Sequence, residues 1–82
     1  MKIRPHRGSL ADAMADVREF ATSAEVIDYI IERESPYRVV TPLDIECEPY
    51  GYDERIQWDT HMITIYGHAA YFTDGPLDAV SA

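Results

Sequence analysis

The spacing of apolar residues changes near Pro36, and this change limits the folds open to the chain. In TSAEVIDYIIERE, residues 22–34, apolar residues recur at the three-to-four-residue spacing of a helix. In LDIECEPY, residues 43–50, apolar and mostly acidic residues alternate instead, which is the two-residue period of a strand. Helices followed by strands, rather than interleaved with them, are typical of α+β domains.

Capping residues predict where the helices begin. Ser9 with Asp12, and Thr22 with Glu25, have the spacing of capping boxes, so we expect helices to begin near residues 9 and 22. Pro36 ends the second helix, because a proline disfavours helical geometry in the residue before it. Residues 17–20 fit either the end of the first helix or a short strand.

Three strands are expected after residue 36, within residues 43–50, 57–66 and 69–74. The sequence YGHA predicts a two-residue type II′ turn with Gly67 first. This register pairs Ile63 with Phe72 and His61 with Asp74.

The expected fold is therefore a small α+β domain, with one or two helices packed on a three-stranded, mainly antiparallel sheet. One domain is expected to span residues 1–82. It divides into a basic extended N-terminus (1–8), a helical part (9–35), a β part (39–75) and a C-terminal tail (76–82).

The net charge of the chain limits the classes of partner that it can bind. Fifteen acidic residues against seven basic ones give a net charge of −8, which disfavours free nucleic acid and favours a basic protein surface. A single cysteine, Cys47, allows no internal disulfide and fits a reducing compartment. Because no apolar run approaches the length of a membrane span, we expect a cytoplasmic protein without a membrane partner. A core this small leaves homodimerisation open as a way to bury more surface.

Residues 49–61, PYGYDERIQWDTH, concentrate the side chains of a recognition site. Tyrosine, tryptophan and arginine dominate the energetics of protein interfaces. The candidate binding residues are Tyr50, Tyr52, Asp53, Glu54, Arg55, Trp58, Asp59, His61 and Asp74. An acidic contact face on the preceding strand adds Asp44, Glu46 and Glu48. For Trp58, a place in the core and a place in the interface remain equally open.

Catalysis or metal binding by Asp59, His61 and Asp74 is the weaker interpretation. The sequence has no HExxH motif, no paired His/Cys spacing and no glycine-rich phosphate loop. A histidine beside an aspartate on neighbouring strands is more often a structural pair. We therefore expect no enzymatic activity, no catalytic residue, no metal and no cofactor.

Three blocks, MKIRPHRGSL, PYGYDERIQWDTH and FTDGPL, resemble a group of small proteins encoded by tailed phages and prophages. Gln57 replaces a glycine common in that group, so we expect the local turn to be altered. The resemblance implies a phage accessory protein, acting in the cytoplasm of the host bacterium against a host defence system.

Two functions fit these observations. The preferred one is an anti-CRISPR-like inhibitor, which binds a host defence protein with a basic surface through the acidic and aromatic residues above. The alternative is a small-ligand binder that sequesters a nucleotide immune signal, with Arg55, His61 and the aromatic rings holding phosphate and base.

Overall fold

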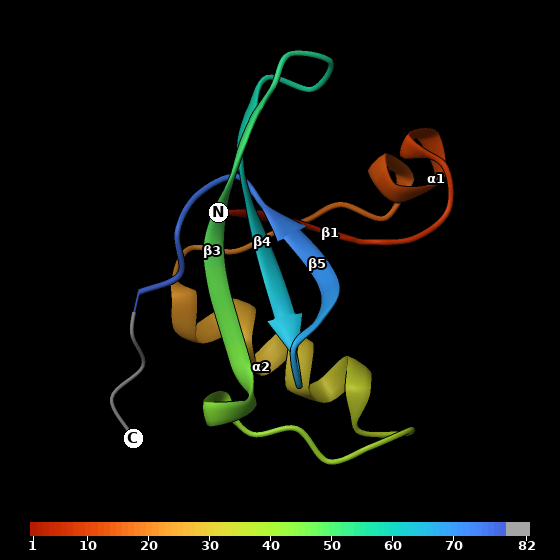
Figure 1. Cartoon of the computed structure of the whole chain (residues 1–82). Coiled ribbons are helices and arrows are strands. Elements are labelled where there is room, and N and C mark those ends of the chain that lie inside the picture. Colours follow the sequence, from red (N-terminus) through yellow and green to blue (C-terminus); the bar gives the residue numbers. More distant parts are fainter. Residues whose placement is uncertain (79–82) are drawn as a thin grey trace.

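Helix α2 (Ser23–Glu34) crosses one face of an antiparallel sheet of five strands, seen in Figure 1. The computed structural model describes residues 1–78, so the end of the expected tail, residues 79–82, lies outside the described part. The sheet order is β2-β1-β5-β4-β3. The strands are β1 (Lys2–Pro5), β2 (Arg18–Glu19), β3 (Ile45–Asp53), β4 (Trp58–Ile65) and β5 (His68–Thr73).

The α+β class is confirmed, whereas the expected number of three strands is wrong. The two additional strands come from segments expected to be an extended terminus and part of the helical region. In β1, Ile3 lies opposite Thr73 of β5 and, on its other side, opposite Arg18 of β2. Helix α1 (Leu10–Ala15) ends before β2, so residues 17–20 contain a strand rather than more helix.

Both helices begin at the expected caps. The Ser9 hydroxyl accepts a hydrogen bond from the Asp12 amide at 3.2 Å, and the Thr22 hydroxyl accepts one from the Glu25 amide at 3.2 Å. Such caps satisfy amides that the first turn of a helix leaves unpaired. No helix among residues 1–78 is long and apolar enough to cross a membrane.

The core lies between α2 and the sheet. Val26 and Ile30 of α2 are fully buried, and so are Ile63 and Ile65 of β4. Burial of each such side chain contributes about 1.5–3 kcal/mol, so this contact is the main source of stability. Other members of the same cluster are Ile3, Val40 and Tyr71.

The turn between β4 and β5 differs from the predicted one. Its two central residues are Tyr66 (φ 52°) and Gly67 (φ 80°), the pattern of a type I′ turn. A register shift leaves Ala70 unpaired with β4, and Ile63 lies opposite Tyr71 rather than Phe72. The extra residue therefore turns Phe72 to the sheet face away from α2.

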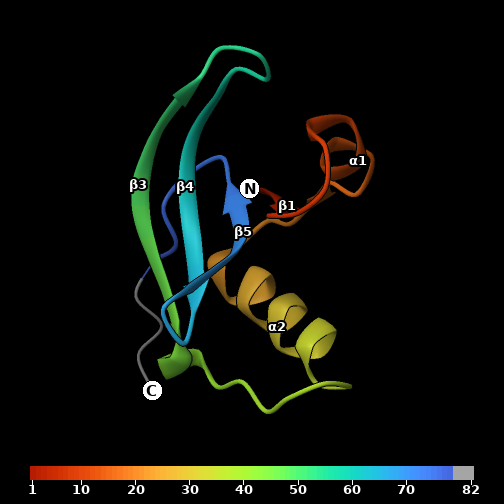
Figure 2. The same ribbon diagram turned by 45° about the vertical axis from the view of Figure 1, so that its right-hand side comes forward.

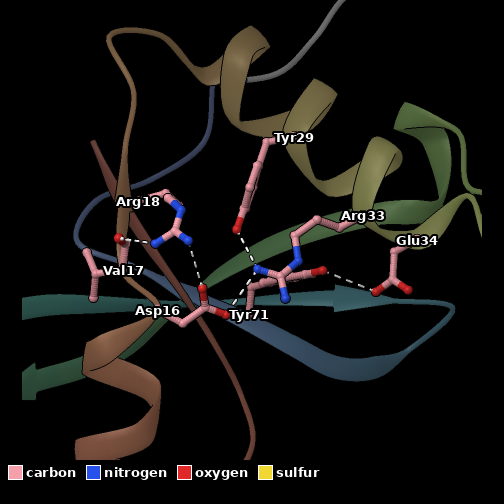
Figure 3. A network of polar contacts seen from close by, with 7 residues as sticks. All are labelled: Asp16, Val17, Arg18, Tyr29, Arg33, Glu34 and Tyr71. Atoms are coloured by element: carbon pink, nitrogen blue, oxygen red, sulfur yellow. Dashed lines mark hydrogen bonds and ion pairs between the residues drawn. The ribbon is translucent and has the colours of Figure 1, made fainter.

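A polar network lies between α2 and the neighbouring elements (Figure 3). Arg33 donates to the Asp16 carboxylate at 3.1 Å and to the Tyr29 hydroxyl at 2.6 Å. The Tyr71 hydroxyl donates to Glu34 at 3.3 Å. These contacts connect α2 both to the segment between α1 and β2 and to β5.

Strands β3 and β4 form a hairpin whose tip projects beyond the rest of the chain (Figures 1 and 2). Near the tip, the pairing shifts between Pro49 and Gly51, which leaves Tyr50 as a bulge. In the turn, Gln57 has a φ of 57°, a left-handed conformation that glycine adopts more readily.

Candidate functional site

A groove lies on the sheet face opposite α2, between the β1–α1 connection and the β3–β4 hairpin. Its volume is about 890 Å³. Residues from the N-terminal segment, from the hairpin tip and from the sheet itself line it together. Besides residues of β3 near the tip, the sheet contributes Arg4, Thr60 and Phe72 to the lining.

Arg4 is the buried cation of this groove. It is only 7% exposed, and its guanidinium carbon lies 4.6 Å from the ring centroid of Phe72 and 5.7 Å from that of Trp58. Its Nε atom is buried and has no hydrogen-bond partner among residues 1–78. Burial lowers the pKa of Arg4, the charge of Asp53 opposes that change, and the charge of Arg55 adds to it.

The Arg4 position follows from the pairing of β1 with β5. Arg4 lies opposite Phe72, and Phe72 lies opposite Met62 on β4, all on the face away from the core. An arginine stacks well on aromatic faces, so the stem and the guanidinium of Arg4 cover apolar surface there.

The hairpin tip contributes an ion pair to the rim of the groove. Arg55 donates to both oxygens of Asp53, from Nε at 3.0 Å and from a terminal nitrogen at 2.7 Å. This pair lowers the pKa of Asp53 and raises that of Arg55. The lining holds three arginines, Arg4, Arg7 and Arg55, against two carboxylates, Asp53 and Glu54. One net positive charge results, in a chain whose net charge is −8.

Aromatic rings surround Phe72. The Tyr50 ring centroid lies 5.2 Å from that of Phe72, and the His6 ring meets Phe72 edge-on at 5.1 Å. Tyr50 and Tyr52 remain 66% and 62% exposed. The groove thus combines a buried cation with accessible planar rings.

The structure brings five of the predicted binding residues together at this groove, namely Tyr50, Tyr52, Asp53, Glu54 and Arg55. Trp58 is 5% exposed and lies beneath Arg4, so the open question about this side chain is resolved in favour of the interior.

The remaining three candidates, Asp59, His61 and Asp74, do not line the groove, and Asp59 is exposed on β4 opposite Tyr52. His61 pairs with Thr73 and not with Asp74, so the predicted pairing is wrong. His61 is buried on the α2 face, and its Nδ1 lies 2.9 Å from the Asp59 carbonyl oxygen. Since a carbonyl only accepts, Nδ1 carries the proton. Asp74 accepts a hydrogen bond from the Lys2 amide at 2.8 Å, which ties it to β1.

The acidic contact face contains two of its three expected members. Glu46 and Glu48 are exposed on β3, opposite Thr64 and Met62. Asp44 instead ends the short 3-10 helix η1 (Pro42–Asp44). Its carboxylate accepts hydrogen bonds from the Thr41 amide at 2.8 Å and the Thr41 hydroxyl at 2.9 Å, which lower the pKa of Asp44.

Sequence reasoning missed Arg4, His6 and Arg7 on the N-terminal side of the groove, and Phe72 of β5. One signal was present, because the basic residues cluster in the first seven positions. That cluster suggested an exposed terminus, whereas one of its arginines is buried in a strand.

Comparison of the chain with protein-family models, with curated proteins and with solved structures found no match.

Proposed function

We propose that this chain is a non-enzymatic binding protein that attaches to a basic surface of a partner protein through the β3–β4 hairpin. The observation that carries the proposal is the exposure of Tyr50 and Tyr52, at 66% and 62%, on the projecting part of that hairpin. Exposed tyrosines supply large rigid contact area at low entropic cost, which is why they anchor interfaces.

Charge supports the same surface. Glu46 and Glu48 are exposed on the strand that carries both tyrosines. With a net charge of −8, the protein attracts basic partners over a distance, and the glutamates orient the encounter. A surface that holds nucleic acid is a basic surface of this kind.

The biological role that fits is that of a phage or prophage accessory protein that inhibits a host defence protein. The resemblance of the three sequence blocks to phage proteins supports this role. Inhibition would be stoichiometric, because the hairpin would occupy the surface on which the defence protein binds nucleic acid.

The test begins with capture of partners from a bacterial host lysate, followed by binding measurements with the purified partner. Tyr50→Ala/Tyr52→Ala is expected to weaken that binding at least tenfold, as loss of two anchors worth about 1 kcal/mol or more each would do. Tyr37→Ala is the matched control, since Tyr37 is 86% exposed but lies outside the hairpin. Equal affinity of the double variant and the wild type would refute the proposal.

A homodimer through the same hairpin would compete with the partner. Sedimentation velocity of the wild type and of Tyr50→Ala/Tyr52→Ala therefore belongs before the binding measurements. A dimer that dissociates only in the double variant would assign the hairpin to self-association instead.

A further inference from the structure

We propose that the groove beside Arg4 is a binding site for a small molecule that carries an oxyanion, either phosphate or carboxylate, together with a planar ring. This site shares Tyr50 and Tyr52 with the partner contact proposed above, but its charged anchor is Arg4, which that contact does not use.

The first step is the state of Arg4. A cation buried to 93% has lost most of its hydration, and the stacking on Phe72 and Trp58 offsets only part of that loss. The buried Nε of Arg4 has no hydrogen-bond acceptor among residues 1–78. A buried donor of this kind is usually satisfied by an acceptor, and a carboxylate or phosphate matches the planar fork of arginine.

The second step concerns the nearby carboxylate of Asp53, which already accepts hydrogen bonds from Arg55. Asp53 accepts at Oδ1 from the backbone amide and Nε of Arg55, and at Oδ2 from a terminal nitrogen of Arg55. Asp53 therefore acts on Arg4 through its charge and forms no hydrogen bond with it. Residues 1–78 thus offer Arg4 Nε no acceptor, and a bound oxyanion can supply one.

The third step is the shape and chemistry of the rest of the groove. Small-molecule sites commonly enclose roughly 300–1,000 Å³, and this groove, at about 890 Å³, is within that range. Tyr50 and Tyr52 border it with accessible rings, against which a planar ring of the ligand can stack. Arg7 adds a second positive charge from the N-terminal side.

The sequence analysis placed Arg55 and His61 on the phosphate of a nucleotide. The structure changes that assignment, since His61 is buried on the opposite sheet face and Arg55 is paired with Asp53. Arg4, in contrast, has a buried Nε without a hydrogen-bond partner among residues 1–78.

The experiment uses three probes at constant ionic strength: AMP, ribose 5-phosphate and adenosine. Trp58 is the only tryptophan and lies 5.7 Å from the Arg4 guanidinium carbon, so its fluorescence reports on the groove. The Nε–H resonance of Arg4 in a nitrogen-15 spectrum reports on the anchor itself. We expect AMP to shift both signals saturably, and to bind more tightly than ribose 5-phosphate or adenosine.

Variants of Arg4 assign the binding to that side chain. Arg4→Lys keeps the charge but loses the planar fork, so AMP is expected to bind about tenfold more weakly, and Arg4→Met is expected to abolish binding. Arg38→Met is the matched control, because Arg38 also stacks on a ring, that of Tyr66 at 5.5 Å, but does not line the groove.

Three results would overturn the inference in whole or in part. If none of the probes moves the Arg4 resonance of the folded wild type at millimolar concentration, the site does not exist. If Arg4→Met binds AMP as tightly as the wild type does, Arg4 is not the residue that binds the oxyanion. If ribose 5-phosphate binds as tightly as AMP, stacking of a planar ring does not contribute to binding, whereas recognition of the oxyanion is retained. The wild-type spectrum decides the matter even if Arg4→Met fails to fold. These outcomes concern Arg4, whereas the partner contact is tested separately by the Tyr50→Ala/Tyr52→Ala variant.

Discussion

The phenol of Tyr71 on β5 donates a hydrogen bond across 3.3 Å to the carboxylate of Glu34, the last residue of α2. Burial of the ring, followed by the charge of Glu34, raises the pKa of Tyr71 to about 12. The phenol thus stays protonated in the folded chain at a pH where the unfolded chain has already lost the proton.

This difference predicts a loss of stability in alkali. Between pH 10.0 and about pH 12, unfolding releases the Tyr71 proton, so the free energy of unfolding falls as pH rises. The slope from this group is at most about 1.4 kcal/mol per pH unit, and it vanishes below the ordinary tyrosine pKa. Tyr71→Phe lacks this slope. Urea unfolding of both proteins across the range measures it, since all other groups titrate in both, and a difference that is constant with pH would contradict the assignment.

Arg33 is expected to contribute more to stability than Arg18, although both contact Asp16. Arg33 reaches Asp16 at 3.1 Å and also the Tyr29 hydroxyl, and its side chain is 29% exposed. The Arg18 side chain is 53% exposed and reaches Asp16 at 3.3 Å. Arg33→Met is expected to lower the free energy of unfolding by about 1–2 kcal/mol, because it leaves partly buried polar groups unpaired. Arg18→Met is expected to change it by about 0–0.5 kcal/mol. Chemical denaturation of both variants compares them, and equal losses would show that the network in Figure 3 adds nothing.

Gln57→Gly is expected to stabilise the chain. Gln57 has a φ of 57°, where a side chain is strained and glycine is not. Relief of that strain, less the extra freedom glycine gives the unfolded chain, should raise the free energy of unfolding by about 0.5–1 kcal/mol. Gln57→Ala is the control, because it shortens the side chain and keeps the strain. Thermal melting of the three proteins decides, and a lower midpoint for Gln57→Gly would show that the glutamine side chain stabilises the turn.

Removal of charge from β3 is expected to slow association with a basic partner. Glu46→Gln/Glu48→Gln should reduce the association rate constant several-fold at low salt and much less at high salt, while dissociation stays the same. Asp28→Asn/Glu32→Gln removes the same charge from exposed positions of α2 and is the matched control. Surface plasmon resonance over a range of salt concentrations measures both. If the control slows association equally, net charge and not the β3 surface governs the encounter.

Local sequence signals were sufficient for the helices. The Ser9 and Thr22 caps act between residues three positions apart, so their geometry can be recognised from spacing alone. The strand alternation before Pro49 predicted part of β3, which begins at Ile45 rather than Leu43 and continues past Pro49 to Asp53.

The features that were not predicted depend on pairing between strands that lie far apart in the sequence. Strand β1 is four residues long and gains its partners only from β5 and β2, so its burial depends on residues far along the chain. The unpaired Ala70 leaves no mark in the alternation, yet it moves Phe72 to the groove face. From the sequence, Arg4 is expected to be exposed like most arginines. It is buried because it stacks on the rings of Phe72 and Trp58. The part of the candidate site that contains Arg4 and Phe72 therefore could not be predicted from the sequence.

Strand β3 stands at one end of the strand order, where an open edge invites further chains to extend the sheet. Pro49 offers no amide there, the bulge at Tyr50 interrupts the ladder, and Glu46 and Glu48 would meet their own counterparts in a second copy. Edge-to-edge pairing of identical molecules is thus discouraged. A lysine-rich chain avoids the charge repulsion, although Pro49 and the bulge still limit how much of a strand can pair. The β3 edge, whose glutamates disfavour pairing between copies of this protein, is therefore the edge best suited to contact with a positively charged chain.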